Sequence, residues 1–149
     1  MSKKISLPDI KTFEFTTQRT IPASPEEVFE GWLDPENPGT PWHGSSKLTL
    51  EPRVDALWSF THVIDGIVLP HFGRFTTLER GKKLQYTWMS RHTMGLETVV
   101  TVNLQKKGDD TLLTLTHANL PDNEYGYAHD GGWNSLVDTL AKGFKKVHA

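Results

Sequence analysis

Residues 57–78, LWSFTHVIDGIVLPHFGRFTTL, contain two strand-like apolar segments on either side of the dipeptide Asp65-Gly66. Asp-Gly is typical of two-residue hairpin turns, because both central positions of such a turn take a positive φ. This turn fixes a predicted antiparallel register, with the pairs Ile64–Ile67, His62–Leu69, Phe60–His71 and Trp58–Gly73. Proline has no N–H group to donate to a ladder, so we expect Pro70 to cause a bulge or to occupy an edge position.

The predicted hairpin has one aromatic face. Side chains alternate along a strand, so the register brings one set to a single face: Trp58, Phe60, His62, Leu69, His71 and Phe75. The other face suits water, since it carries Ser59, Thr61, Arg74 and Thr76. The aromatic face therefore needs a cover from another part of the chain.

The last segment of the chain predicts that cover. Between residues 129 and 147, apolar side chains recur at spacings of three and four: Trp133, Leu136, Val137, Leu140 and Phe144. This spacing predicts an amphipathic helix of roughly four turns. We expect Trp133, Leu136 and Leu140 to face the sheet.

The N-terminal part predicts a strand followed by a short helix. Residues 13–21 are rich in aromatic and β-branched side chains, as strands are. Ser24 is a suitable N-cap, and Glu27 completes a Ser-x-x-Glu capping box with it. The helix should end before Pro35, because the residue before a proline disfavours the helical region.

The order of these segments predicts the fold class. Strand-like segments joined by short turns follow one another between residues 47 and 117. Short turns imply antiparallel neighbours, so the chain is predicted to be α+β, with an antiparallel meander covered by helices. We expect residues 1–149 to form a single domain, with residues 1–11 as a polar lead-in.

Composition excludes several classes of protein. The 16 Lys and Arg residues are balanced by 18 Asp and Glu residues, which leaves no cationic excess for binding nucleic-acid phosphates. The absence of cysteine excludes disulfides, thiol catalysis and thiolate metal sites. No apolar run is long enough for a signal segment or a membrane span, so a cytoplasmic location is expected.

Several short motifs, in this order along the chain, are similar to those of the START-like (SRPBCC) superfamily. They are Ser24-Pro25-Glu26-Glu27-Val28-Phe29-Glu30 with Trp32, Pro41-Trp42, Glu51-Pro52-Arg53-Val54, Gly73-Arg74-Phe75, Leu84-Gln85-Tyr86-Thr87-Trp88, Thr114-Leu115-Thr116-His117, and His129 with Gly132-Trp133-x-x-Leu136. Within the superfamily, the chain most resembles the activator of heat-shock-protein-90 ATPase homologue-like family. It departs from the family pattern at Asp55-Ala56, where two glycines usually follow Arg-Val.

The resemblance implies a helix-grip fold. In this fold a curved antiparallel sheet of about six to seven strands surrounds a long C-terminal helix, usually with an apolar cavity between them. The family name does not define a function, because function depends on the site rather than on the fold. The full-length eukaryotic activator engages its chaperone through a separate N-terminal domain, for which this chain has no room. A chaperone partner is therefore an expectation that rests on the resemblance alone.

The residues expected to face such a cavity form the predicted ligand-binding set. They are Trp58, Phe60, His62, His71, Gly73, Phe75, Tyr86, Trp88, Trp133, Leu136 and Leu140. Gly73 would leave room for a ligand, while His71 and Tyr86 would orient it through hydrogen bonds. The alternative is a solid aromatic core without a cavity.

Histidines are the main candidates for chemistry. His71, His117 and His129 are the candidate catalytic residues, because imidazole titrates near neutral pH. His117 and His129 are expected to flank a loop at residues 118–128, where they could instead hold the strand end and the helix start. His62 and His71 lie close together in the predicted register, but a third ligand for a metal is lacking. We expect neither a metal nor a cofactor.

Two functions are consistent with these features. The first is a protein that binds a hydrophobic, aromatic or lipid-like small molecule, as a monomer or homodimer, and that serves in stress response or as a chaperone-associated accessory. The second is an enzyme of the polyketide cyclase or dehydrase type, with a cavity histidine as general acid or base. The predominance of aromatic and aliphatic inward-facing residues favours binding without catalysis.

Overall fold

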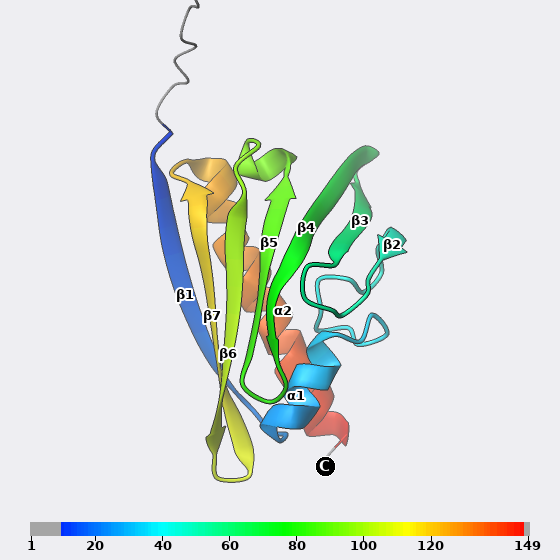
Figure 1. The fold of residues 1–149 in the computed structure, drawn as a ribbon, viewed down its shortest axis with the longest axis vertical. Helices are drawn as coiled ribbons and strands as arrows, with labels where there is room; N and C mark the ends of the chain where they lie inside the picture. Colours follow the sequence, from blue (N-terminus) through cyan, green and yellow to red (C-terminus); the bar gives the residue numbers. More distant parts are fainter. Residues whose placement is uncertain (1–9, 148–149) are drawn as a thin grey trace, which may run out of the picture.

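The computed structural model describes residues 10–147, so residues 1–9 of the expected lead-in, and His148, lie outside the described part. Within this described part, two α-helices, one short 3-10 helix and seven strands follow one another (Figure 1). They are β1 (Thr12–Ile21), α1 (Pro25–Trp32), β2 (Ser46–Thr49), β3 (Leu57–Ile64), β4 (Ile67–Glu79), β5 (Lys83–Ser90), η1 (Arg91–Thr93), β6 (Thr98–Lys107), β7 (Asp110–Pro121) and α2 (Glu124–Val147).

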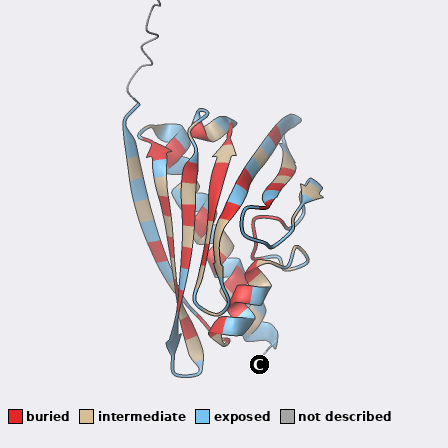
Figure 2. Ribbon diagram, in the orientation of Figure 1, coloured by how far each residue is buried: buried red, intermediate tan, exposed pale blue. Residues whose placement is uncertain are grey.

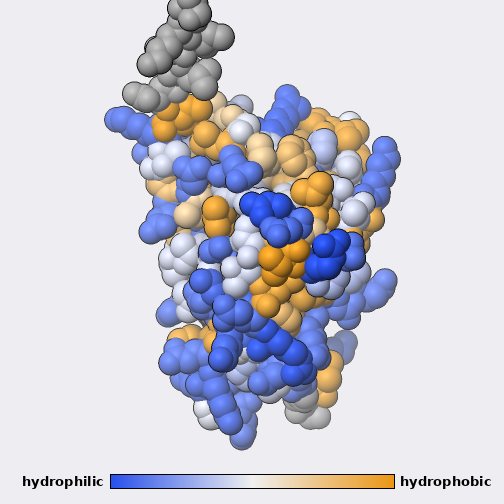
Figure 3. All heavy atoms as spheres, viewed as in Figure 1, coloured by the Kyte–Doolittle hydropathy of each residue, from blue (hydrophilic) through white to orange (hydrophobic). Residues whose placement is uncertain are grey.

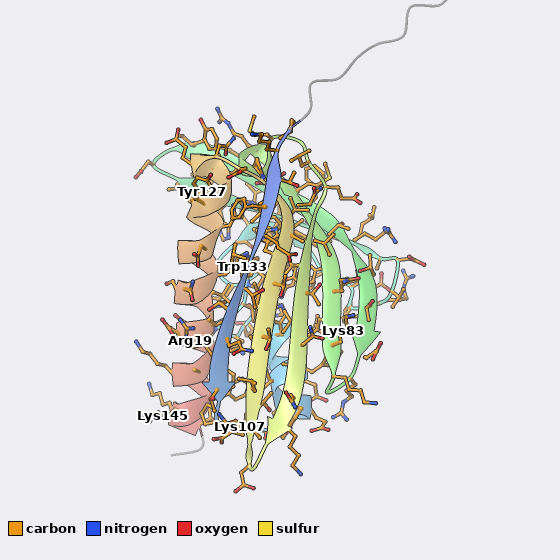
Figure 4. The ribbon with its side chains drawn as sticks, turned by 90° about the vertical axis from the view of Figure 1, so that its left-hand side faces the viewer. Arg19, Lys83, Lys107, Tyr127, Trp133 and Lys145 are labelled. Carbon is orange, nitrogen blue, oxygen red and sulfur yellow. The ribbon has the colours of Figure 1, made fainter. Side chains whose placement is uncertain are left out.

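The seven strands form one antiparallel sheet in the order β1-β7-β6-β5-β4-β3-β2. The sheet curves around α2, which lies along its inner face, and α1 lies near the C-terminal end of α2 (Figure 1). Figure 4 shows the same arrangement from the side, with α2 on one side of the strands. The predicted α+β helix-grip fold is confirmed. Between residues 10 and 147, no helix is both long and apolar enough to cross a bilayer.

The predicted hairpin forms with the expected register. Its pairs run without interruption from Ile64–Ile67 to Leu57–Arg74, and Asp65 and Gly66 both have positive φ. No bulge occurs at Pro70, which pairs with Thr61. The neighbouring strand β5 ends opposite His71, so Pro70 has a partner strand on only one side and its missing N–H group costs little.

The first helix begins as predicted. Ser24 accepts a hydrogen bond from the backbone N–H of Glu27, and the Glu27 side chain accepts one from the backbone N–H of Ser24. This capping box satisfies two N–H groups that the helix itself cannot pair. The helix buries Val28, Phe29 and Trp32 against the sheet side of the molecule.

The second helix begins earlier than predicted. It starts at Glu124 rather than at residue 129, and β7 continues to Pro121, so the expected loop at residues 118–128 is replaced by a two-residue connection. The side chain of Asn123 makes this possible, because its Oδ1 accepts hydrogen bonds from the backbone N–H groups of Tyr125 and Gly126.

The interior between sheet and helix is filled mainly by aromatic rings. Trp42, from the connection between α1 and β2, is almost completely buried in its centre. Its ring lies 5.3–6.2 Å, centroid to centroid, from the rings of Trp58, Phe60, Phe75 and Tyr86. Figure 2 shows buried residues along the strands, in bands that alternate with less buried ones, and on α2. The centre of the molecule is therefore a packed core.

Gly73 does not open a space in this core. A Cβ atom at Gly73 would lie 1.9 Å from the carbonyl oxygen of Thr87 and 2.7 Å from a ring carbon of Trp58. The expectation that Gly73 leaves room for a ligand is corrected by this geometry. The glycine instead allows the backbones of β4 and β5 to approach each other closely.

The outer face of the β3–β4 hairpin is more apolar than predicted. On this face the large hydrophobic side chains of Leu57, Val63, Val68 and Phe72 are exposed. Ile64 and Ile67 are also exposed, but they lie beside the turn on the opposite face of the hairpin. Figure 3 shows hydrophobic residues among hydrophilic ones on the outer face of the sheet. The expected polar residues are present as well, with Arg74 exposed and Ser59 and Thr61 partly exposed.

Candidate ligand-binding site

A pocket of about 250 Å³ opens at one end of the sheet, between the first half of α2, η1 and strands β3–β5. Its lining comes from six parts of the chain, namely the connection between α1 and β2, strands β3, β4 and β5, η1, and α2. The lining residues are Pro41, Phe60, His62, His71, Trp88, His92, Tyr125, Ala128, His129, Gly132, Trp133 and Leu136. Among the described residues, no Asp, Glu, Lys or Arg lines the pocket.

The deep wall of the pocket consists of three aromatic rings. Trp88 lies 5.1 Å from Trp133 and 5.8 Å from Phe60, measured between ring centroids. All three residues are at least nine-tenths buried, which holds their rings in place. Trp133 projects from α2 toward the strands (Figure 4). Such a wall can hold a flat apolar molecule through burial and ring contacts.

Four imidazoles surround the same space, each from a different element. They are His62 of β3, His71 of β4, His92 of η1 and His129 of α2. The ring of His71 stacks on Phe60 at 4.8 Å and lies 5.9 Å from His62, while His92 stacks on Tyr125 at 5.7 Å. No group of three or more His, Asp or Glu side chains within residues 10–147 is arranged to hold a metal ion.

Backbone carbonyls determine the tautomers of two of these rings. Nδ1 of His71 lies 3.0 Å from the carbonyl oxygen of Leu69, and Nδ1 of His129 lies 3.0 Å from that of Tyr125. A carbonyl can only accept, so each Nδ1 carries the proton and each Nε2 keeps its lone pair in the neutral ring. Burial lowers the pKa of His71 to about 4 and also lowers the pKa of His129, so both rings are neutral at pH 7.

His117 lies behind this pocket, in a closed hydrogen-bond chain. The indole N–H of Trp133 donates to Nδ1 of His117 at 2.8 Å, and Nε2 of His117 donates to the hydroxyl of Thr98 at 2.7 Å. That hydroxyl in turn donates to the carbonyl oxygen of Trp88. Burial lowers the pKa of His117 well below its usual value. Both ring nitrogens are occupied, so His117 holds Trp133 in place and has no atom available for proton transfer.

Comparison with known families shows to which family the chain belongs. The family model described as Activator of Hsp90 ATPase homolog 1-like protein matches residues 22–145. The chain belongs to this family. No curated protein matches the sequence significantly.

Solved structures of similar proteins share the family fold. Protein CV1439 from Chromobacterium violaceum is 22% identical, with a TM-score of 0.76 over 88% of this chain and 96% of that one. The Aha1 dimer from Colwellia psychrerythraea is 16% identical, with a TM-score of 0.67 over 89% and 96% of the two chains. DynU16, from the dynemicin biosynthetic locus, is 23% identical, with a TM-score of 0.69 over 91% of this chain and 47% of that one.

Part of the predicted ligand-binding set of this chain lines the pocket. The predicted residues that line it are Phe60, His62, His71, Trp88, Trp133 and Leu136. The other predicted residues, Trp58, Gly73, Phe75, Tyr86 and Leu140, lie in the packed core or between strands and do not line it. The physical reason is Trp42, whose ring occupies the space that the register alone left open.

Tyr86 and His129 also differ from their predicted roles. The hydroxyl of Tyr86 is fully buried, where it accepts a hydrogen bond from the indole N–H of Trp32, so it does not reach the pocket. Burial raises the pKa of this hydroxyl. His129 lies inside α2 rather than at its start, and one turn of helix precedes it.

Sequence reasoning missed several lining residues. Pro41 lies in an irregular connection, and His92 in a short helix between strands, where hydrophobic periodicity gives no signal. Tyr125 and Ala128 lie in the first turns of α2, which the apolar spacing placed outside the helix. The dipeptide Asp122-Asn123 before Glu124 was the available signal, because Asp and Asn are common N-caps.

Proposed function

We propose that this protein binds a small, uncharged, mainly aromatic molecule in the pocket between α2 and strands β3–β5. The observation that carries this proposal is the composition of the pocket wall. Phe60, Trp88 and Trp133 form its deep side, and no charged side chain of the described residues lines it. Ligand pockets of this kind are mostly apolar with a few polar groups that orient the guest.

The size of the pocket limits the ligand. An engineered apolar cavity of about 150 Å³ holds benzene in another protein, and a single water takes up about 30 Å³. The pocket described here has a volume of about 250 Å³. We therefore expect a ligand of roughly one substituted ring or two fused rings, with any longer chain extending through the open mouth.

The histidines support binding more than catalysis. An efficient general base has a pKa near the working pH, whereas the pKa of His71 is lowered to about 4. Its Nδ1 is held by a neutral backbone carbonyl rather than by a carboxylate, which would strengthen a base. His117 is closed off by its two hydrogen bonds.

A cyclase-type enzyme is the second candidate function. It is favoured by one observation, the Nε2 atoms of His71 and His129, which have no hydrogen-bond partner among the described residues. DynU16, which shares the fold, is described as a putative protein in the dynemicin biosynthetic locus. The substrate of the second function would be a polyketide-like guest. Turnover of such a guest that is lost in His71→Phe while binding persists would favour this second function.

A chaperone partner and a homodimer are separate expectations. They derive from the family name and from the dimeric relative of Colwellia psychrerythraea. The pocket proposal depends on neither of them. Cross-linking and sedimentation of the purified chain, alone and with an Hsp90 chaperone, would test both expectations directly.

Two neighbouring glycines on α2 provide a matched test of the pocket. Gly132 lines the pocket and Gly131 does not, and a Cβ atom at either position would meet nothing within 4 Å. A Gly132→Leu variant should therefore fold normally and place its side chain in the pocket. We expect its affinity for 2-methoxynaphthalene to fall at least about tenfold, which corresponds to about 1.4 kcal/mol. Quenching of tryptophan fluorescence would measure this affinity.

Gly131→Leu is the control, since it adds the same side chain one residue away on an exposed part of the helix. Both variants should unfold at a urea concentration no lower than that of the wild type, because leucine favours helices over glycine. Equal affinity of all three proteins for the probe would contradict the proposed site.

A further inference from the structure

His71 and His129 share an arrangement that restricts what the pocket can bind. In each ring Nδ1 donates to a backbone carbonyl oxygen, that of Leu69 for His71 and those of Tyr125 and Gly126 for His129. The backbone, which cannot change its role from acceptor to donor, therefore fixes both tautomers. Each neutral ring presents Nε2 as an acceptor.

Both Nε2 atoms are available to a ligand. Within residues 10–147 neither atom has a hydrogen-bond partner. Neither Nε2 atom is fully buried. In the described part of the chain, the fully buried side-chain nitrogen and oxygen atoms without a hydrogen-bond partner are the indole nitrogens of Trp58 and Trp88. The two acceptors therefore keep access to solvent or to a guest in a pocket that both rings line.

We propose that the pocket selects a neutral hydroxylated aromatic molecule, a phenol, whose hydroxyl donates its one hydrogen bond to Nε2 of His71, while Nε2 of His129 can accept from a second hydroxyl where the guest carries one. This inference rests on the proposed function and names the ligand class of the same site. His71 is the main acceptor because its ring is held between Phe60 at 4.8 Å and Trp88 at 5.1 Å. A ring held in this way loses little freedom when it accepts a hydrogen bond.

Two other ligand classes fit less well. A carboxylate would meet two lone pairs and no Lys or Arg among the lining residues, and protonation of His71 to receive it is opposed by burial. An ether or ketone brings only an acceptor, so it leaves both Nε2 atoms unpaired in the complex. Within residues 10–147 the rings of His62 and His92 have no hydrogen bond to a carbonyl oxygen. These two lining residues can therefore act as donor or acceptor and do not contribute to this selection.

Three naphthalene derivatives of the same ring size separate these classes. We would titrate the wild-type protein at pH 7.5 with 2-naphthol, 2-methoxynaphthalene and 2-naphthoate, following tryptophan fluorescence or heat. One net hydrogen bond changes affinity by about threefold to tenfold. We expect 2-naphthol to bind about three to ten times more tightly than 2-methoxynaphthalene, and 2-naphthoate to bind more weakly than both.

A variant then assigns the acceptor. His71→Phe keeps an aromatic ring beside Phe60 and Trp88 but removes Nε2, so the preference for 2-naphthol over 2-methoxynaphthalene should fall to less than about twofold. The affinity for 2-methoxynaphthalene itself should persist. His43→Phe is the control, since His43 is exposed and lies outside the pocket lining.

The outcomes distinguish this inference from the proposed function. Equal binding of 2-naphthol and 2-methoxynaphthalene, or tightest binding of 2-naphthoate, would overturn the phenol inference and leave an aromatic binding pocket. Failure of all three probes to bind would overturn the proposed function itself. If His71→Phe does not fold, ¹⁵N spectra of the wild-type imidazoles decide the point: a protonated Nε2 on His71 at pH 7.5 would overturn the inference.

Discussion

A Trp133→Ala variant is expected to lose about 4 kcal/mol of unfolding free energy, together with most of its affinity for an aromatic probe. Trp133 is 4% exposed and forms contacts on two sides, with Trp88 at 5.1 Å and with Trp32 at 6.2 Å. The change removes this burial, opens a void in the pocket wall and leaves Nδ1 of His117 without its donor. Urea unfolding followed by circular dichroism would measure the loss.

Trp133→Phe is the matched control for this prediction. It keeps an aromatic ring in the wall and removes the indole N–H that His117 accepts, so the loss should be about 1–3 kcal/mol. Typical domains unfold with about 5–15 kcal/mol, so this variant should remain folded and bind the probe. A loss below about 1 kcal/mol in Trp133→Ala would contradict the packing described here.

Acidification from pH 7 to pH 4.5 is expected to lower the unfolding free energy by about 2–4 kcal/mol. Burial lowers the pKa values of His71, His117 and His129 in the folded protein, while unfolded histidine titrates near 6.5. Between these pKa values the unfolded chain binds more protons, so stability rises with pH. The contribution of these three histidines to stability is complete above about pH 7. It is lost as the pH falls through their pKa values in the folded protein.

His117 provides the geometric reason for part of this loss. A proton on Nδ1 would face the indole N–H of Trp133, so the protonated ring loses the hydrogen bond that it accepts from Trp133, although Nε2 still donates to Thr98. His117→Gln offers one acceptor and one donor without titrating, and it should flatten the profile between pH 6.5 and pH 4.5 by up to about 1.4 kcal/mol per pH unit. A wild-type profile without slope in this range would contradict the neutral, buried state of these rings.

The sequence contained most of the information for the hairpin and the helix caps. Asp65-Gly66 specifies a turn whose length sets the register, and the register of β3 and β4 follows it pair by pair. Ser24 and Glu27 act over three residues, which makes their capping box visible without tertiary information. Features that depend on local chemistry of this kind can be read from one sequence.

The position of the pocket could not be read in the same way. It depends on Trp42, whose ring fills the space next to Trp58 and Phe75. Trp42 lies in the connection between α1 and β2, where the sequence has no repeating hydrophobic pattern. Gly39, three residues earlier, lets this connection approach α2 closely, since a Cβ atom there would lie 2.3 Å from the Cα atom of Leu140. Only tertiary packing shows that the cavity lies at one end of the sheet rather than at its centre.

The tautomers of the histidines also depend on tertiary contacts that the sequence does not indicate. The sequence placed His62 and His71 on one face, and their rings do lie 5.9 Å apart. It gave no sign that Leu69 would hold Nδ1 of His71, or that Trp133 and Thr98 would close off His117. The roles of these residues follow from which ring nitrogen is occupied, and hydrogen-bond partners that are distant in sequence decide this.

The most direct test of the binding site uses the five tryptophans of the chain as reporters. Trp88 and Trp133 line the pocket, whereas Trp32, Trp42 and Trp58 do not. In ¹⁵N-labelled protein titrated with 2-naphthol, we predict that the indole N–H resonances of Trp88 and Trp133 show the largest shifts. Largest shifts at Trp42 and Trp58, or no shift at saturating probe, would contradict a binding pocket at this end of the sheet.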